Sequence, residues 1–298
     1  MDAVAPTCAA QRIAAVIENR PVARQTYRLR LDAPEMARDI APGQFLMIRA
    51  GSSGDPLLGR PFALYDVVRD VSGAPTALDV VYLVVGKGTA ALSERRPGDR
   101  LPVWGPLGNG FGPAPEPSGP VVFVAGGIGQ TPFLALGRWW LGAGDYGGLD
   151  AGPGRATSAT LLYGVRTVEL AAGVEDFRAA GMAVELATDD GSAGYHGRVT
   201  DLLAQRFQRG ERPAKVVGCG PPAMLAALAR LAHEYSVPCE VSLENHMACG
   251  FGACFSCVAP IRQTDGSTDL RRVCVEGPVF SSAAVVWEEH RGHTETIR

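Results

Sequence analysis

Apolar residues in the first third of the chain alternate with polar ones or form short apolar runs, and the runs end at turn-forming stretches such as residues 41–43 and 96–99. Alternation with a period of two is typical of strands that bury one face. The pattern predicts one short helix, at residues 89–95, and six strands, at residues 12–16, 26–31, 44–49, 62–67, 78–85 and 100–103. Short strands at this spacing indicate a small all-β antiparallel barrel.

The pattern changes after a proline-rich stretch at residues 112–120, which we interpret as a domain boundary. Strand-like runs now alternate with segments of helical period. Strands are expected at residues 121–125, 160–163, 183–187, 215–217 and 240–243, and helices at residues 131–141, 168–180, 199–207 and 222–235. This alternation predicts an α/β domain with a doubly wound parallel sheet. The glycine-rich stretch at residues 142–158 is expected to form a surface loop.

The chain therefore divides into four parts. They are a barrel domain at residues 8–115, an α/β domain at 120–244, a short cysteine-containing segment at 245–280 and a C-terminal tail at 281–298. Two sizeable domains agree with a length of 298 residues.

Composition excludes several classes of protein. Hydrophobic residues make up 46% and charged residues 20%, as is typical of a folded globular chain. The formal net charge is −3, so the chain lacks the basic excess that neutralises nucleic-acid phosphates. The apolar runs are shorter than the ~18 residues that cross a membrane. The N-terminus lacks the pattern of a secretory signal, so we expect a cytoplasmic protein.

Two glycine-containing turns follow predicted strands of the α/β part. Gly126, Gly127 and Gly129 stand between an apolar strand and a helix that begins near Pro132, a pattern typical of phosphate binding at a helix N-terminus. The spacing is not G-x-G-x-x-G, so a plain strand-to-helix turn remains the alternative. The second turn, at residues 218–221, ends a strand at the sheet edge where ligands of such folds bind. A buried structural cysteine is the alternative there.

Two weaker motifs lie in the barrel part. Arg60 directly precedes a predicted strand and can donate two parallel hydrogen bonds to a phosphate. Gly88 and Thr89 open the short helix, where backbone amides are free. A surface arginine and an ordinary turn are the alternatives.

Four of the seven cysteines crowd the C-terminal part of the chain. Cys249, Cys254 and Cys257 have the spacing C-x4-C-x2-C, and Cys274 follows after a gap of sixteen residues. Three thiolates on one glycine-containing loop and a distant fourth are typical of a [2Fe-2S] cluster with plant-type ferredoxin spacing. Four thiolates also hold zinc tetrahedrally, so a structural zinc site is the alternative.

These motifs, in this order along the chain, resemble the ferredoxin reductase superfamily. Within that superfamily, the segments 242–257 and 272–280 resemble the electron transfer subunit of NAD-dependent dihydroorotate dehydrogenase. A plant-type ferredoxin domain would place a longer gap before its last cysteine and occupy a fold of its own. The resemblance runs from about residue 12 to residue 280.

The resemblance implies sites for FAD, NAD and a [2Fe-2S] cluster. The implied FAD contacts are Arg60, Pro61, Phe62, Ala63, Val81, Tyr82, Leu83, Gly88 and Thr89. The implied NAD contacts are Gly126, Gly127, Ile128, Gly129, Thr131, Pro132, Gly220 and Pro221, with Cys219 as the catalytic position. The implied cluster ligands are Cys249, Cys254, Cys257 and Cys274. Ala63 and Leu83 depart from the family pattern, which usually has Ser or Thr and Arg at these positions.

The resemblance also implies a function. Hydride would pass between NAD and FAD, and single electrons would pass through the cluster to a partner. The implied partner is an FMN-containing catalytic subunit that interconverts dihydroorotate and orotate in pyrimidine biosynthesis, in a heterotetramer with two copies of each chain. Phe251 and Phe255 are then expected near the subunit interface.

Three questions stay open at the level of sequence. A reductase of the same build could serve a hydrogenase, a transhydrogenase or an oxygenase. A non-catalytic module that binds zinc or senses redox state is an alternative from a different class. Arg166 follows a predicted strand and fits either the 2′-phosphate of NADP or the adenine ring of NAD, so the choice of dinucleotide is undecided.

Overall fold

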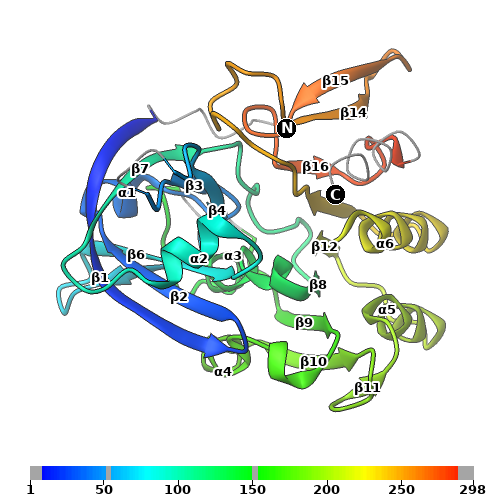
Figure 1. The fold of residues 1–298 in the computed structure, drawn as a ribbon. Helices are drawn as coiled ribbons and strands as arrows, with labels where there is room; N and C mark the ends of the chain where they lie inside the picture. The colour runs from blue at the N-terminus through cyan, green and yellow to red at the C-terminus, as the bar shows by residue number, and fades with distance from the viewer. Residues whose placement is uncertain (1–8, 52–54, 150–153, 288–298) are drawn as a thin grey trace.

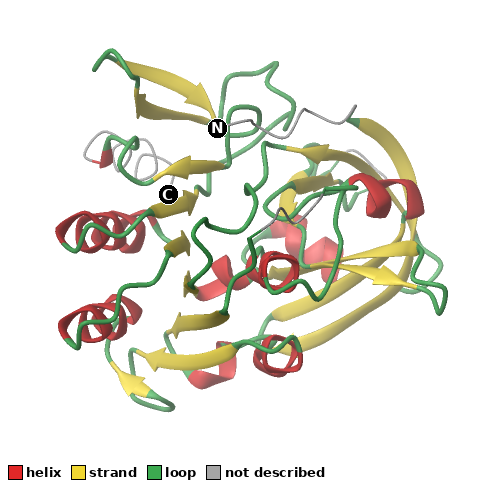
Figure 2. Ribbon diagram, turned by 180° about the vertical axis from the view of Figure 1, so that it is seen from behind, coloured by secondary structure: helices red, strands yellow, loops and turns green. Residues whose placement is uncertain are grey.

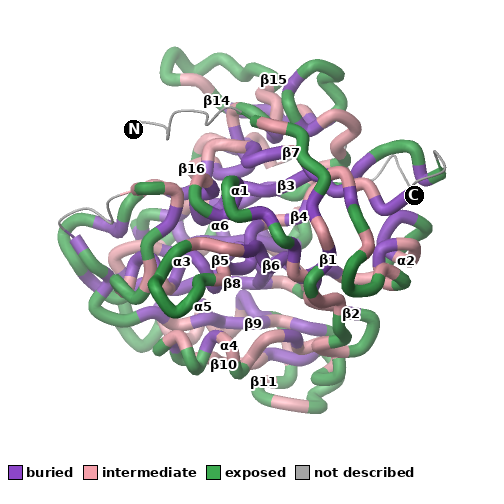
Figure 3. Tube along the Cα trace, turned by 90° about the vertical axis from the view of Figure 1, so that its left-hand side faces the viewer, coloured by how far each residue is buried: buried purple, intermediate pink, exposed green. Residues whose placement is uncertain are grey.

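Two seven-stranded sheets and a two-stranded hairpin make up the structure, a computed structural model that describes residues 9–51, 55–149 and 154–287 (Figure 1). The first sheet comes from the N-terminal third of the chain, and the second from the central part. The hairpin projects from the C-terminal segment (Figure 1). The buried residues gather in and between the two sheets, and the exposed ones follow the peripheral loops (Figure 3).

The first sheet is antiparallel and strongly curled, with the order β4-β3-β7-β1-β2-β6-β5. Its strands are β1 (Ala10–Ala23), β2 (Thr26–Asp32), β3 (Phe45–Ile48), β4 (Arg60–Ala63), β5 (Asp66–Arg69), β6 (Pro75–Leu83) and β7 (Arg100–Leu107). Its helices are α1 (Pro34–Asp39) and α2 (Lys87–Ser93). The predicted antiparallel barrel is thus confirmed as a curled sheet.

The prediction of one strand at residues 62–67 was wrong, because the chain crosses there from one edge of the sheet to the other. The backbone N–H of Leu64 donates to Gln44 beside β3, whereas the N–H of Tyr65 donates to Asp79 in β6. Consecutive amides therefore bond to opposite edges. Both side chains are buried, so the apolar pattern continues across the break and hides it.

Helix α1 was not predicted from the sequence, because it is only six residues long and begins at a proline. Pro34 occupies the start of the helix, where a missing backbone N–H costs nothing. Met36 and Ala37 point inward and are buried. The first strand is longer than predicted, since β1 continues to Ala23 through two register irregularities.

The second sheet has the order β11-β10-β9-β8-β12-β13-β16 and confirms the predicted doubly wound fold. Its strands are β8 (Pro120–Gly126), β9 (Ser158–Val165), β10 (Ala183–Thr188), β11 (Tyr195–His196), β12 (Lys215–Cys219), β13 (Cys239–Ser242) and β16 (Val279–Ser281). All are parallel except β16, which pairs antiparallel with β13. The α-helices are α3 (Phe133–Trp140), α4 (Val174–Ala179), α5 (Val199–Gln208) and α6 (Pro222–Glu234). Helices α5 and α6 cover one face, and α3 and α4 lie on the face toward the first sheet (Figure 2).

Two features of this half differ from the prediction. The helix expected at residues 168–180 is short, because Gly173 adopts a left-handed φ of 73° and α4 begins only after it. Residues 168–170 form a separate 3-10 turn. The cysteine-containing segment holds a hairpin of β14 (Val258–Arg262) and β15 (Thr268–Arg272), and it returns to the main sheet through β16. That segment is therefore joined to the α/β domain by backbone hydrogen bonds.

A group of polar side chains connects the two sheets, and we call it the polar seam: Tyr65, Asp66, Arg138, Tyr146 and Asp176. The Tyr65 hydroxyl donates to an Asp176 carboxylate oxygen at 2.7 Å. Asp66 of β5 accepts hydrogen bonds from Arg138 of α3 and from the Tyr146 hydroxyl, each at 2.7 Å. Tyr146 belongs to the stretch 142–158, and only 3% of it is exposed. This end of the predicted surface loop is therefore anchored in the interior between the two domains.

We expect Tyr146→Phe to lower the free energy of unfolding by about 1.5–3 kcal/mol, the range for a hydrogen bond to a charged group. The substitution leaves the ring in place and removes one donor from Asp66. Burial already raises the pKa of this carboxyl, so the loss of a donor is costly. Urea denaturation followed by tryptophan fluorescence measures the change. An unchanged transition midpoint would contradict the importance of the seam.

None of the helices in the described part of the chain is long and apolar enough to span a bilayer.

Candidate cofactor sites

The two glycine-containing turns meet at the point where the strand order of the second sheet reverses. Strand β8 lies between β9 and β12, so the turns that follow β8 and β12 are neighbours. A Cβ on Gly129 would lie 2.3 Å from the Cys219 carbonyl oxygen. A Cβ on Gly126 would lie 2.7 Å from Pro221. Only glycine permits this approach, and crevices at such switch points are where α/β sheets bind ligands.

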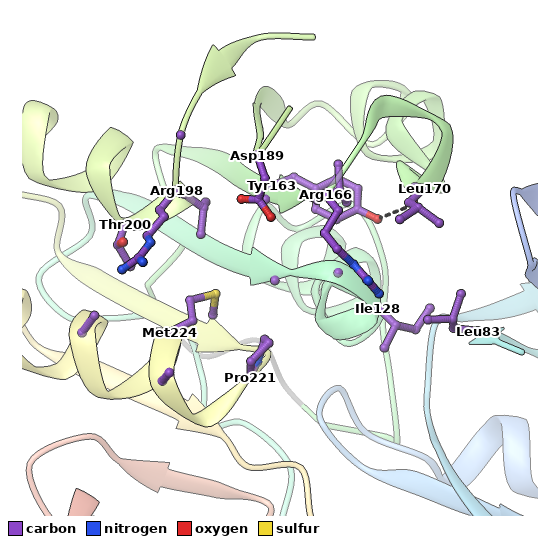
Figure 4. A pocket seen from close by; sticks show the side chains of 18 of the residues that line it. Leu83, Ile128, Tyr163, Arg166, Leu170, Asp189, Arg198, Thr200, Pro221 and Met224 are labelled. Carbon is purple, nitrogen blue, oxygen red and sulfur yellow. Dashed lines mark hydrogen bonds between the residues drawn. The ribbon is translucent and has the colours of Figure 1, made fainter. Parts of the chain in front are cut away.

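A cavity of about 530 Å³ opens at this switch point (Figure 4). Of the residues predicted to contact NAD, four line it: Gly126, Gly127, Ile128 and Pro221. The buried residues Gly129, Pro132 and Gly220 are not among the lining residues, so they support the turns from behind. Thr131 and Cys219 face a different cavity.

Charged residues from the carboxyl ends of the strands line the same cavity. Arg166 follows β9, Asp189 follows β10, and Arg198 precedes α5. Figure 4 shows the two arginines entering from opposite sides, with Asp189 between them in that view. Sequence reasoning found Arg166 and missed the other two. The signal for Asp189 was available, because an acidic residue at the end of a strand commonly binds a ribose hydroxyl in dinucleotide folds.

A second cavity, of about 450 Å³, lies between the first sheet and the α/β domain. All nine residues predicted to contact FAD line it: Arg60, Pro61, Phe62, Ala63, Val81, Tyr82, Leu83, Gly88 and Thr89. A Cβ on Gly88 would approach the Arg60 Nε to 3.2 Å, so the glycine lets the arginine lie across the start of α2. At Gly86 a Cβ would meet open space. The lining of the cavity is mostly apolar and includes the cation of Arg60, which fits a flavin nucleotide.

Aromatic contacts hold the wall of this second cavity. Tyr82 is buried; its ring centroid lies 5.6 Å from that of Phe62, and its hydroxyl donates to Asn19 at 3.0 Å. The Thr89 hydroxyl accepts the backbone N–H of Val85 at 2.9 Å and donates to the Gly86 carbonyl. These polar groups already form hydrogen bonds within the protein. The wall thus presents a fixed apolar surface to a ligand.

Three residues line both cavities: Leu83, Ile128 and Glu244. Ligands in the two cavities would therefore meet at this junction. Cys219 lies beside it in the second cavity, where burial raises the pKa of its thiol well above the usual value. The thiol is protonated at neutral pH and does not act as a thiolate nucleophile.

Glu244 is the residue at this junction that the sequence analysis missed. Its side chain is exposed to the cavities. The surrounding protein nevertheless keeps much of the solvent away from the carboxyl, and this desolvation raises its pKa. A ligand in either cavity would cover it further. The residue stands two positions after the end of β13, the last parallel strand, and no spacing motif marks it.

The loop at residues 249–257, which carries Cys249, Cys254 and Cys257 and which we call the cysteine loop, is docked on the first sheet close to the second cavity. The indole N–H of Trp104 in β7 donates to the Cys249 carbonyl at 2.8 Å. A Cβ on Gly250, where φ is 81°, would lie 2.5 Å from Met47 of β3. Met247, two residues before Cys249, lines the second cavity together with Asn245 and His246. The loop and that cavity are therefore adjacent.

The three thiols of this loop and the thiol of Cys274 are arranged as two pairs. The side chains of Cys254 and Cys249 interact, and hydrogen bonding from Ser256 and Cys249 lowers the pKa of Cys254 to about 6. A hydrogen bond with Cys274 lowers the pKa of Cys257 to about 6 and raises that of Cys274. Among the described residues, no three Cys, His, Asp or Glu side chains converge as a site for one metal ion. In each pair one thiol has a lowered pKa, and two pairs of cysteines fit two iron atoms that each take two thiolates.

Comparison with known proteins identifies the family of the chain. The iron-sulfur cluster binding domain of dihydroorotate dehydrogenase B matches residues 244–286, and the oxidoreductase NAD-binding domain matches residues 123–230. The dihydroorotate dehydrogenase B (NAD(+)) electron transfer subunit of Desulforamulus reducens is 39% identical over 90% of this chain and 95% of its own length. The chain belongs to this family of electron transfer subunits. The relative of the same name from Geobacillus thermodenitrificans is 37% identical over 91% of this chain and 96% of its own length.

The solved structures agree with this membership. The NADH-dependent reduced ferredoxin-NADP oxidoreductase, studied for flavin-based electron bifurcation, has a TM-score of 0.78 at 27% identity and covers 96% of this chain and 94% of its own. The ferredoxin reductase in carbazole 1,9a-dioxygenase has a TM-score of 0.62 at 21% identity, over 77% of this chain and 67% of its own, and supports the fold alone. The resemblance to the ferredoxin reductase superfamily is confirmed. The iron-sulfur match contains all four candidate ligand cysteines, and the NAD-binding match contains both glycine turns.

Proposed function

We propose that this chain is the electron transfer subunit of an NAD-dependent dihydroorotate dehydrogenase, acting in the cytoplasm in pyrimidine biosynthesis. One observation carries the proposal: the three candidate sites are contiguous. The two cavities share Leu83, Ile128 and Glu244, and Met247 joins the second cavity to the cysteine loop. Contiguous sites suit a chain of electron carriers, because electrons transfer only over short distances.

We assign the second cavity to FAD, the first to NAD and the cysteine loop to a [2Fe-2S] cluster. When bound, FAD exchanges hydride for single electrons, and the cluster carries one electron at a time. The chain's own residues bind and orient these groups. Arg60 would supply a cation for the FAD phosphates, and the glycine turn at residues 126–129 would let the NAD phosphates approach the backbone. Leu83 and Ile128 would exclude water from the junction of the two cavities.

Asp189 is the residue that we expect to select NAD over NADP. A carboxylate on the cavity wall accepts hydrogen bonds from a ribose hydroxyl and repels a 2′-phosphate. We expect Asp189→Asn to lower the ratio of kcat/KM for NADH over NADPH by about tenfold, which requires only about 1.4 kcal/mol. Asp190→Asn is a matched control, because Asp190 is exposed and bound by Ser192. An unchanged ratio in Asp189→Asn would indicate that Arg166 and Arg198, rather than Asp189, determine the choice between NAD and NADP.

The exposed surface around the cysteine loop is the expected docking site for the catalytic subunit. Phe251 and Phe255 are 58% and 62% exposed, although large apolar side chains are usually buried. Both stand between cysteines of the loop, so a subunit that covers them lies close to the cluster. We propose an FMN-containing catalytic subunit as this partner, in a heterotetramer with two copies of each chain.

The proposal is tested by mixing the purified chain with a catalytic subunit that oxidises dihydroorotate. We expect reduction of NAD that depends on dihydroorotate and requires both chains, and a complex that elutes as one species in size-exclusion chromatography. If NADH reduces dyes but the catalytic subunit neither binds nor exchanges electrons, the chain serves another acceptor. A protein that binds zinc and no flavin would support the non-catalytic module instead.

A further inference from the structure

An ion pair between Arg272 and Glu276 lies beside the cysteine loop. Arg272 ends β15, two residues before Cys274, and its guanidinium donates to Glu276 at 2.7 Å. The backbone N–H of Arg272 donates to the same carboxylate at 2.8 Å. Both side chains are half-buried, with 29% and 27% of their surfaces exposed. Charges in such a place are screened less than charges on the open surface.

The Arg272 side chain also contacts the cysteine loop. Its guanidinium carbon lies 5.0 Å from the centroid of the Phe255 ring, in a cation–π contact. One terminal nitrogen donates to the Gly252 carbonyl at 3.3 Å. Gly252 has a φ of 87°, and a Cβ there would approach this arginine to 3.2 Å. The guanidinium is thus fixed between the cysteine loop and the segment that carries Cys274.

The charge of Arg272 lies close to the cysteines, because its guanidinium contacts Gly252 and Phe255 and the residue stands two positions before Cys274. The hydrogen bond with Glu276 raises the pKa of the guanidinium. Arginine stays protonated at every accessible pH, so the positive charge is permanent. Glu276 places a negative charge on the same side, and its ion pair with Arg272 keeps its pKa below the usual value.

We propose that Arg272 and Glu276 form an opposed charge pair that sets the reduction potential of the iron-sulfur site. Reduction adds one electron to the site, so a fixed positive charge nearby favours it and a fixed negative charge opposes it. Arg272 therefore raises the reduction potential, and Glu276 lowers it and so offsets part of that increase. The inference rests on the proposed assignment of the four cysteines as cluster ligands. Both residues are positioning residues, since neither is a ligand.

The test is a redox titration of the intact holoprotein, followed by EPR, for Arg272→Gln and Glu276→Gln. Iron and acid-labile sulfide are measured first on every sample. We expect Arg272→Gln to lower the equilibrium constant for cluster reduction about tenfold, which is 59 mV for one electron, and Glu276→Gln to raise it by a similar factor. The double variant should return close to the native value. A purely structural role would shift both single variants in the same direction.

Arg271→Gln is the matched control, because Arg271 is the neighbouring residue of β15 and bonds to Gln263 and Asp269 rather than to the loop. We expect no shift from it. If Arg272→Gln lowers the iron content, Arg272→Lys replaces it, because it keeps the positive charge and should keep the native reduction potential. In that case the direction of the potential shift in Glu276→Gln still tests the inference. Single variants that carry the cluster but match Arg271→Gln would overturn the inference. Native protein without iron and sulfide would instead refute the proposed cluster itself.

Discussion

Cys254→Ser abolishes electron transfer to the catalytic subunit while NADH-dependent reduction of an artificial dye continues. Cys254 is exposed on the loop, pairs with Cys249 and has a thiol pKa of about 6, so it is ready to bind iron as a thiolate. A serine oxygen is a poor substitute for that soft ligand. We expect transfer to the partner to fall by more than about 100-fold, since even changes outside the ligand set cost 10- to 100-fold at metal sites. Stopped-flow assays with each acceptor measure both activities.

Cys239→Ser is the control for this experiment. Cys239 is a buried cysteine at the start of β13 and is not one of the four candidate ligands, so we expect its replacement to leave both activities in place. The opposite pattern in Cys254→Ser, with dye reduction lost and transfer to the partner retained, would show that the order of carriers is wrong. Loss of both activities would indicate that the loop supports the flavin cavity itself.

Gly129→Ala weakens NADH binding by more than about tenfold, or about 1.4 kcal/mol. The added methyl group would lie 2.3 Å from the Cys219 carbonyl oxygen and 2.8 Å from the Gly220 nitrogen, so the turns after β8 and β12 must separate. Backbone atoms cannot give way as a flexible side chain does. We also expect the free energy of unfolding to fall by about 1–3 kcal/mol, as for other overpacked interiors. Fluorescence titration with NADH and urea denaturation measure the two effects.

Gly112→Ala is the matched control, because a Cβ at Gly112 would meet nothing within 4 Å. The same chemical change there should alter neither NADH binding nor stability. Native affinity in Gly129→Ala would show that the dinucleotide does not depend on the close approach of the two turns. The NAD site would then have to lie elsewhere on the domain.

Sequence reasoning succeeded where a function requires a fixed spacing of residue types. The C-x4-C-x2-C pattern is local, so it located the loop directly. The glycine turns follow from the same logic, since the switch point of the sheet brings them together and only glycine fits. The nine barrel residues came from the family resemblance, and the structure gathers them in one cavity.

Sequence reasoning failed where a contact depends on the tertiary path of the chain. The division of residues 62–67 between two sheet edges leaves no mark on the apolar pattern. Glu244 becomes a junction residue only because β13 ends between the two cavities. The seam residues Asp66, Arg138 and Tyr146 lie far apart in the sequence, so no local signal connects them.

The most direct test of the account is one spectroscopic experiment on anaerobically purified protein. Absorption and EPR spectra are recorded before and after NADH is added, and iron, zinc and acid-labile sulfide are assayed on the same sample. The account predicts flavin bands that NADH bleaches, the EPR signal of a reduced [2Fe-2S] cluster, and about two iron and two sulfide per chain. A colourless protein that contains zinc, binds no flavin after reconstitution and does not oxidise NADH would contradict it.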